Sequence, residues 1–210
     1  MADDLKYGYK GAEPTQSFGN NTGVFDPNDI NNLIADNKWT QYGQLELIET
    51  QSSTANTTAI NFESIGDYDT YYLSFIGDVN GTGYQYWSLR FGNSGTYIAT
   101  GYQYHRAGYS STTSTHAASS NDTELRIGPY SKFQDNGYAY IHNIRDANKS
   151  TFVTGGGINP AGNHKADATM TYASGTLPNA TSYDCIQILR SFSVSWGEGF
   201  RASLYGIKRA

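Results

Sequence analysis

The sequence predicts an all-β chain: a jelly-roll-like antiparallel β-sandwich, preceded by an extended N-terminal arm and one short helix. The composition favours strands, since 23 glycines, 18 tyrosines and 9 phenylalanines stand beside only 16% charged residues. Short stretches of alternating apolar and polar residues recur between clusters of glycine, asparagine and serine, which indicates about ten strands joined by turns. We find no internal repeat, so a sandwich is favoured over a propeller or a β-helix.

The first part of the chain, residues 1–42, is predicted to be an arm with a short helix, and residues 43–210 to be the sandwich domain. Residues 1–24 are rich in glycine, asparagine and threonine and cannot bury enough apolar surface to order themselves. We therefore expect an extended segment that is either disordered or ordered by a neighbouring protein. Its scattered apolar side chains are Leu5, Tyr7, Tyr9 and Phe18.

A helix is predicted directly after the arm. Asp26 is suited to cap its N-terminus, and Pro27 fits the first turn, where a missing N–H does no harm. Ile30, Leu33 and Ile34 then form one apolar stripe at helical spacing. The sequence thus predicts a short amphipathic helix that ends near residue 36.

Two stretches carry predictions about which side chains face the core. Residues 70–77 are apolar on both faces, the pattern of a strand that is covered on both sides. Residues 165–172 alternate regularly between apolar and polar side chains. We expect the apolar set, which includes Met170 and Tyr172, to point inward.

Other stretches predict strands and the turns between them. Trp87, Leu89 and Phe91 share one face of a strand that continues to a turn at residues 92–95. The three consecutive glycines at residues 155–157 are expected in a second turn.

Charge and length exclude several classes of protein. The net charge is -5 and no run of lysine and arginine occurs, so a nucleic-acid partner is not expected. No apolar stretch is long enough for a membrane span, and residues 1–6 lack the features of a signal peptide. Cys185 is the one cysteine, so an intrachain disulfide is impossible and a buried thiol is expected.

No pattern of catalytic residues is evident, and we expect neither an enzyme nor a bound cofactor or metal. The sequence contains no nucleophile elbow and no phosphate-binding loop. Residues 78–81 resemble the start of a calcium loop but lack the closing glutamate, so only a different kind of cation site stays open. The histidines are dispersed, without metal-ligand spacing, at His105, His116, His142 and His164.

The excess of tyrosine is the main indication of a binding surface. Tyrosine combines a flat apolar ring with a polar hydroxyl, which suits stacking on sugars and burial at protein interfaces. The alternative is that tyrosine serves here simply as a good strand residue. The candidate ligand-binding residues stand just before an expected exposed loop at residues 110–121 and are Tyr102, Tyr104, His105, Arg106 and Tyr109.

Several passages resemble a family of tailed marine bacteriophage proteins, described as tail fibres or virion structural proteins. They are residues 23–30 (GVFDPNDI), 39–51 (WTQYGQLELIETQ), 137–143 (GYAYIHN) and 203–207 (SLYGI), in that order. The resemblance covers roughly residues 20–210, and its motifs are strand and turn patterns, not catalytic signatures. It implies a non-enzymatic homotrimer on the virion surface, assembled in the bacterial cytoplasm, whose arm docks onto another fibre, tail or capsid protein.

Two functions remain open within this family. The first is a knob of the tail-fibre or head-fibre type that binds host-surface glycans. The second is a decoration or cement protein of the capsid or tail, with a purely structural role. A tyrosine-rich patch facing the trimer axis would favour the second, and one facing away from the particle would favour the first. A third hypothesis, a polysaccharide-degrading enzyme, requires two carboxylates that converge in a groove.

Overall fold

The computed structural model describes residues 27–35, 45–54, 57–78, 86–109, 114–128, 134–161, 167–190 and 199–207. The chain divides into two compact units, residues 1–43 together with Ala210, and residues 44–209. In the first unit the described element is the helix α1 (Pro27–Ala35), which lies within the predicted helix. The predicted docking side chains Leu5, Tyr7, Tyr9 and Phe18 lie outside the described residues.

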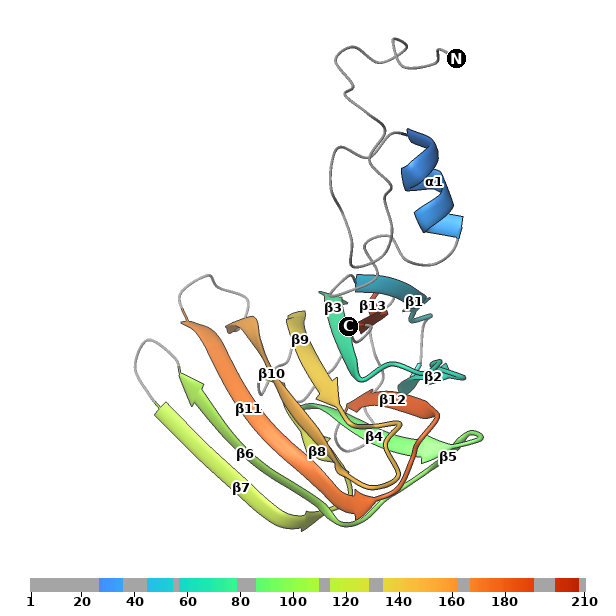
Figure 1. Cartoon of the computed structure of the whole chain (residues 1–210). Helices are drawn as coiled ribbons and strands as arrows, with labels where there is room; N and C mark the ends of the chain where they lie inside the picture. Colours follow the sequence, from blue (N-terminus) through green and yellow to red (C-terminus); the bar gives the residue numbers. More distant parts are fainter. Residues whose placement is uncertain are drawn as a thin grey trace, which may run out of the picture. The chain divides into compact units, whose positions relative to one another are not determined.

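The second unit is built from two antiparallel sheets (Figure 1). The eight-stranded sheet has the order β1 (Leu45–Ser52), β13 (Arg201–Ile207), β3 (Thr70–Asp78), β9 (Gln134–His142), β10 (Ser150–Ala161), β11 (Asp167–Ala180), β6 (Tyr102–Tyr109) and β7 (Ser114–Asp122). The five-stranded sheet has the order β2 (Ala59–Glu63), β12 (Cys185–Arg190), β4 (Trp87–Asn93) and β5 (Thr96–Tyr97), with β8 (Leu125–Arg126) also paired to β4.

The order of the strands is that of a jelly roll. The chain alternates between the sheets so that β1, β13, β3 and β9 lie side by side in one, and β2, β12, β4 and β8 in the other. The hairpin β6–β7 and the strands β10 and β11 are additions that extend the larger sheet beyond β9. Every strand pair is antiparallel. The all-β antiparallel sandwich predicted from the sequence is confirmed.

The core lies between the two sheets and is rich in aromatic rings. Phe75 of β3 meets Trp87 of β4 edge to face, with ring centroids 4.1 Å apart, and so joins the sheets. Tyr102 of β6 is fully buried, and its hydroxyl accepts a hydrogen bond from the Phe91 amide (2.8 Å) and donates one to the Ile98 carbonyl (3.1 Å). Each such buried side chain contributes about 1.5–3 kcal/mol by removal from water. Cys185 is buried, as expected.

One prediction about strand faces is wrong. Met170 and Tyr172 of β11 point away from the core, 39% and 51% exposed, whereas Thr171 between them is buried. Further along the same inner side, a side chain added at Gly175 would lie 3.0 Å from Leu125, so a larger residue does not fit at that position. Near Met170 and Tyr172, the large side chains of β11 lie on the outer side.

Strand β3 is covered on one side within the single chain, so the prediction that both sides are covered stays a prediction about an assembly. Its inner side chains are buried, but Ile76 on the opposite face is 62% exposed and Tyr72 is half-buried, so the described residues cover this strand on one side.

The glycines at 155–157 lie inside β10 and not in a turn. The predicted turn at residues 92–95 is present, and Ser94 and Gly95 adopt positive φ angles there.

The expected loop at residues 110–121 is largely strand β7 at the edge of the larger sheet. Its side chains are exposed or half-buried along its whole length. Because neither face of β7 packs on a core, its sequence needs no apolar alternation, and serine, threonine and alanine suffice. This is why the stretch was predicted to be a loop.

Candidate interaction face

The surface with the most unusual composition is the side of the eight-stranded sheet that points away from the core, here called the outer face. Residues paired directly across antiparallel strands point to the same side. The register therefore arranges the outward side chains in four rows across the sheet. All ten large hydrophobic side chains that are exposed among the described residues lie in these rows: Leu45, Leu47, Ile76, Tyr109, Tyr138, Tyr140, Phe152, Ile158, Met170 and Tyr172.

Aromatic rings on neighbouring strands contact one another along the outer face. Tyr72 of β3 lies between Tyr205 of β13 and Tyr140 of β9, with ring centroids 6.0 and 5.0 Å away. His142 of β9 stacks on Phe152 of β10 at 5.7 Å. Such cross-strand pairs stabilise the sheet by about 0.2–1 kcal/mol each and hold the rings in defined positions.

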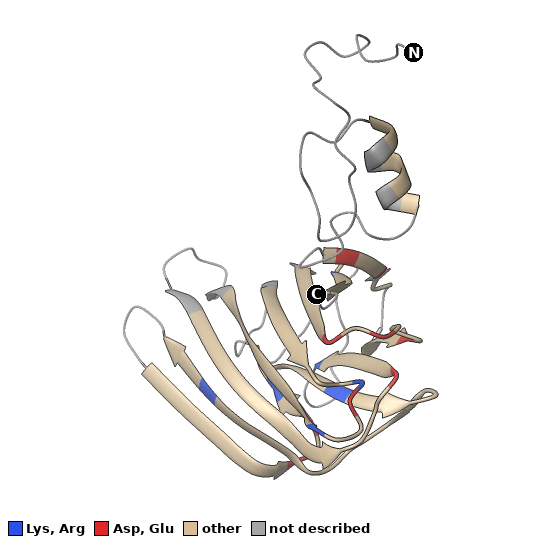
Figure 2. Ribbon diagram, viewed as in Figure 1, with Lys and Arg blue, Asp and Glu red and all other residues tan. Residues whose placement is uncertain are grey.

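The outer face carries almost no charge. Across the four rows the one formally charged side chain among the described residues is Arg201. Figure 2 shows no charged residue in the coloured central parts of β9, β10 and β11. A contact made by this face must therefore rest on apolar surface and hydrogen bonds, not on ion pairs.

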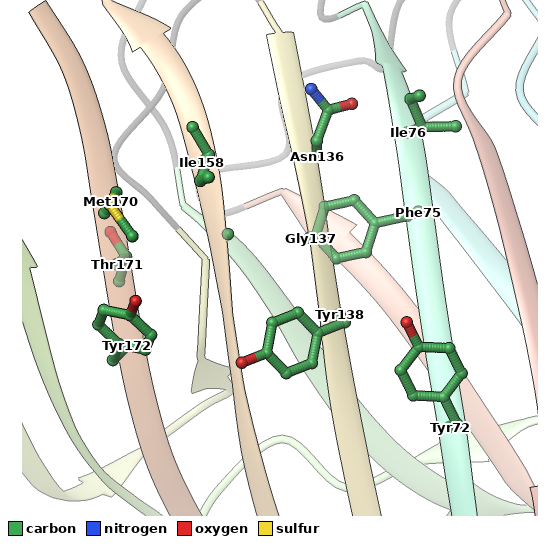
Figure 3. A pocket seen from close by; sticks show the side chains of 11 residues that line it. Tyr72, Phe75, Ile76, Asn136, Gly137, Tyr138, Ile158, Met170, Thr171 and Tyr172 are labelled. Atoms are coloured by element: carbon green, nitrogen blue, oxygen red, sulfur yellow. The ribbon is translucent and has the colours of Figure 1, made fainter.

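A shallow groove of about 360 Å³ lies in the middle of this face. The backbone of Gly137 and Gly157, which are directly paired, contributes to its lining. Figure 3 shows Tyr138 of β9 and Tyr172 of β11 on the two sides of β10, with Ile158 beside them. The groove can receive one apolar side chain or part of a small ligand.

Asn136 and the tyrosine hydroxyls supply the polar groups along the groove. Gly137 cannot be replaced without disturbing the core, because an added Cβ would lie 2.4 Å from the Phe75 ring. The shape of the groove is thus tied to the packing underneath it.

His142 is the histidine on this face with a resolved change in acidity. Its Nδ1 lies 3.0 Å from the Thr70 hydroxyl, and partial burial lowers its pKa below the ordinary value. By contrast, the inward-pointing Tyr71 donates a hydrogen bond to the Gly66 carbonyl, and burial raises its pKa to about 12.

The five candidate ligand-binding residues do not form one surface. Tyr102 and Tyr104 point inward, and both are buried. The Tyr104 hydroxyl donates to Asp122 (3.1 Å), and the Arg106 guanidinium lies 3.7 Å from the centre of the Tyr86 ring. These three residues are held by neighbours within the fold, which explains their place in the sequence without a ligand.

His105 and Tyr109 lie on the outer face and are exposed. Both are near His116 of β7, with ring centroids 6.1 and 6.4 Å from it. A ligand role for these two residues stays a prediction. Sequence reasoning missed Tyr138, Ile158 and Tyr172, for which the only local signal is the alternation of tyrosines at 138 and 140.

A network of charged side chains lies on the outward side of the five-stranded sheet. Glu124 is buried, accepts a hydrogen bond from Ser88 (3.2 Å) and lies 3.4 Å from Arg126 and 3.8 Å from Arg90. Arg126 also pairs with Asp122 at 3.4 Å. These contacts join β4 to β8 and the loop before it, so the cluster has a structural role.

Two carboxylates line a second, polar groove of about 450 Å³ beside β1 and β2. They belong to Glu49 and Glu63, and the Gln51 amide donates to Glu49 at 2.5 Å. The polysaccharide-degrading hypothesis would require such a pair to converge on a substrate.

Within the described part of the chain, no group of three or more histidine, cysteine, aspartate or glutamate side chains could hold a metal ion. The helical residues described contain no segment that could cross a membrane.

Comparison of the chain with models of protein families, with curated proteins and with solved structures found no match. We therefore infer the function from the chemistry of the outer face and from the sequence resemblance described above.

Proposed function

We propose that this chain is a non-enzymatic protein of a bacteriophage virion surface, and that it works by contact through the outer face of its eight-stranded sheet. The proposal follows the tail-fibre and virion-protein resemblance, with homotrimeric assembly and an N-terminal arm that docks onto another virion protein. The main observation in its favour is that, in the part of the chain that the structure describes, all ten exposed large hydrophobic side chains lie on one nearly uncharged face.

A concentration of exposed large apolar side chains on one face indicates an interaction surface. Monomeric proteins rarely expose a contiguous apolar patch above about 300–600 Å². The outer face extends over neighbouring strands from Leu45 on β1 to Tyr109 on β6. It therefore has the character of an interface with a protein partner, which corresponds to the decoration or structural role.

Binding of host-surface glycans is the second candidate, and one observation favours it. Tyr138 and Tyr172 flank a groove that also contains Asn136, so stacking surfaces and hydrogen-bonding groups lie together. However, the exposed side chains of Ile76, Ile158 and Met170 offer sugar hydroxyls no hydrogen bonds. Protein contact is thus the better use of the face as a whole.

Cryo-electron microscopy of the virus that encodes this chain tests the proposal. We expect the chain on the particle surface, with residues 1–24 against another virion protein and the outer face buried in a protein contact. The absence of the chain from purified particles would overturn the proposal. A chain on the particle with its outer face free and turned outward would replace the structural role with glycan binding.

Glycan binding can be tested separately with purified protein on an array of bacterial surface polysaccharides. If this second candidate is right, Tyr138→Ala and Tyr172→Ala abolish a signal that the control Tyr97→Phe, on the smaller sheet, retains. Binding unaffected by the first two variants would exclude the groove as the glycan site.

A further inference from the structure

We infer that the partner of the outer face is the same face on neighbouring copies of this chain. The inference rests on the proposed function, because it names the partner for the surface on which that proposal depends. Three properties of the outer face support this inference: its charge, its area and the types of its side chains.

The charge of the face restricts the partner. A protein surface that carries lysine, arginine, aspartate or glutamate would lose their hydration against this face without gaining an opposite charge, at a cost of several kcal/mol for each buried ion. The partner must therefore be as uncharged and as apolar as the face itself. Among the described residues, the outer face of the eight-stranded sheet is the surface with these properties.

The outward side of the five-stranded sheet does not fit. It exposes the edges of a network formed by Arg90, Arg126 and Glu124, with Asn61 and Gln187 hydrogen-bonded beside it. If this side packed on the outer face, its charged side chains would lose the water that still hydrates them. The outer face has no opposite charges to replace that water. Contact between two outer faces limits that cost to Arg201, the one charged side chain in its four rows among the described residues.

The size of the face also fits a self-contact. The eight strands, spaced about 4.8 Å apart, give a width of about 38 Å, and four rows of side chains give a length of about 24 Å. The resulting area of about 900 Å² is close to the roughly 800 Å² that each partner contributes to a standard interface. A contact between copies of the chain could therefore bury an area of ordinary interface size.

The side chains on the face are of the kinds that interfaces use. Tyr138, Tyr140 and Tyr172 are 37%, 39% and 51% exposed, so large parts of their side chains are open to solvent and can be buried by a partner. Tyrosine is enriched at interfaces because its ring is buried while its hydroxyl bonds across the contact. The central groove, with Asn136 at its wall, offers a place for a side chain of the neighbouring copy.

The test is sedimentation velocity of the full-length chain over a wide range of concentrations. We expect the wild type to associate, and Ile158→Asp, which places a charge at the groove, to weaken association by roughly tenfold or more. Thr96→Lys, on an exposed position of the smaller sheet, is the matched control and should associate as the wild type does. Circular dichroism and the Tm of each variant would show that the fold is retained, since Ile158 is 49% exposed.

Two results would overturn the inference. One is a wild type that remains monomeric at every concentration tested, which would assign the face to another virion protein or to a glycan. The other is association that Ile158→Asp and a second variant, Tyr172→Glu, leave unchanged, which would place the self-contact elsewhere. Neither result bears on whether the chain is part of a virion, so the proposed function is judged separately by its presence on the particle.

Discussion

The outward surfaces of the two sheets differ in a way that their strand structure does not require. On the five-stranded sheet, Glu124 holds Arg90 and Arg126 in a network that Ser88 completes. On the eight-stranded sheet, the corresponding positions hold tyrosine, isoleucine, methionine and threonine, with Arg201 as the one charge in four rows. Both sheets close the same core, so the core does not explain the difference.

The proposed function explains this difference by different surroundings of the two outward surfaces. Charged and hydrogen-bonded side chains suit a surface that remains in water, whereas an uncharged face of tyrosine and aliphatic residues suits one that is covered. The larger sheet has apolar side chains on both of its sides, and one side packs within the chain while we propose that the other contacts a partner.

The largest expected difference in stability is between substitutions on the inner side and on the outer side of strand β3. Leu73→Ala, on the inner side of β3, should lower the free energy of unfolding by about 2–5 kcal/mol at every protein concentration. Tyr72→Ala, on the outer side, should cost about 1 kcal/mol or less in dilute solution. Urea denaturation of both variants measures this contrast.

The loss of stability caused by Tyr72→Ala is also expected to depend on protein concentration. If Tyr72 lies in a self-contact, its replacement should cost more as concentration rises, because association stabilises the folded chain by mass action. An equal cost for Tyr72→Ala at all concentrations would count against burial of the outer face.

An intermediate effect is expected on the smaller sheet. Glu124→Leu removes the carboxylate shared by Ser88, Arg90 and Arg126, and should destabilise the fold by about 1–3 kcal/mol since the remaining polar groups lose their partner. Both arginines are partly exposed, which limits the loss. Thermal unfolding at low and high salt measures it. A neutral result would show that the network contributes nothing beyond solubility.

The smallest effect concerns pH and the outer face. Because burial lowers the pKa of His142 in the folded chain, the unfolded chain binds the proton more readily below the ordinary histidine value of 6.5. Its contribution to stability should be complete above that pH and be lost as the pH falls through the folded pKa. Comparing the Tm of wild type and His142→Gln between about pH 7.5 and about pH 5 tests this. A wild-type Tm that falls no more steeply than that of the variant would contradict it.

Local sequence patterns predicted the strands well but not the sides on which their residues lie. Trp87, Leu89 and Phe91 share one face as predicted, and this face points into the core. On β11 the same reasoning failed, since Thr171 lies on the buried inner side whereas Met170 and Tyr172 are exposed. Alternation shows which residues share a side, whereas the packing of other strands decides which side is inside.

The candidate site could not be read from neighbouring residues. Tyr72, Tyr138 and Tyr172 come from three strands, and the pairing of β3, β9, β10 and β11 brings them to one face. The sequence predicted a tyrosine-rich binding surface, but of its three candidate tyrosines Tyr102 and Tyr104 are core residues and only Tyr109 is exposed on the outer face. A surface formed by the register of distant strands leaves no local motif.

Hydroxyl-radical footprinting of the full-length chain, read by mass spectrometry at low and high protein concentration, tests the central claim most directly. The account predicts that Tyr138, Met170 and Tyr172 are labelled in dilute solution and protected when copies associate, while Tyr97 on the smaller sheet changes little. Equal labelling of the three residues at both concentrations would contradict the claim that the outer face is covered by neighbouring copies.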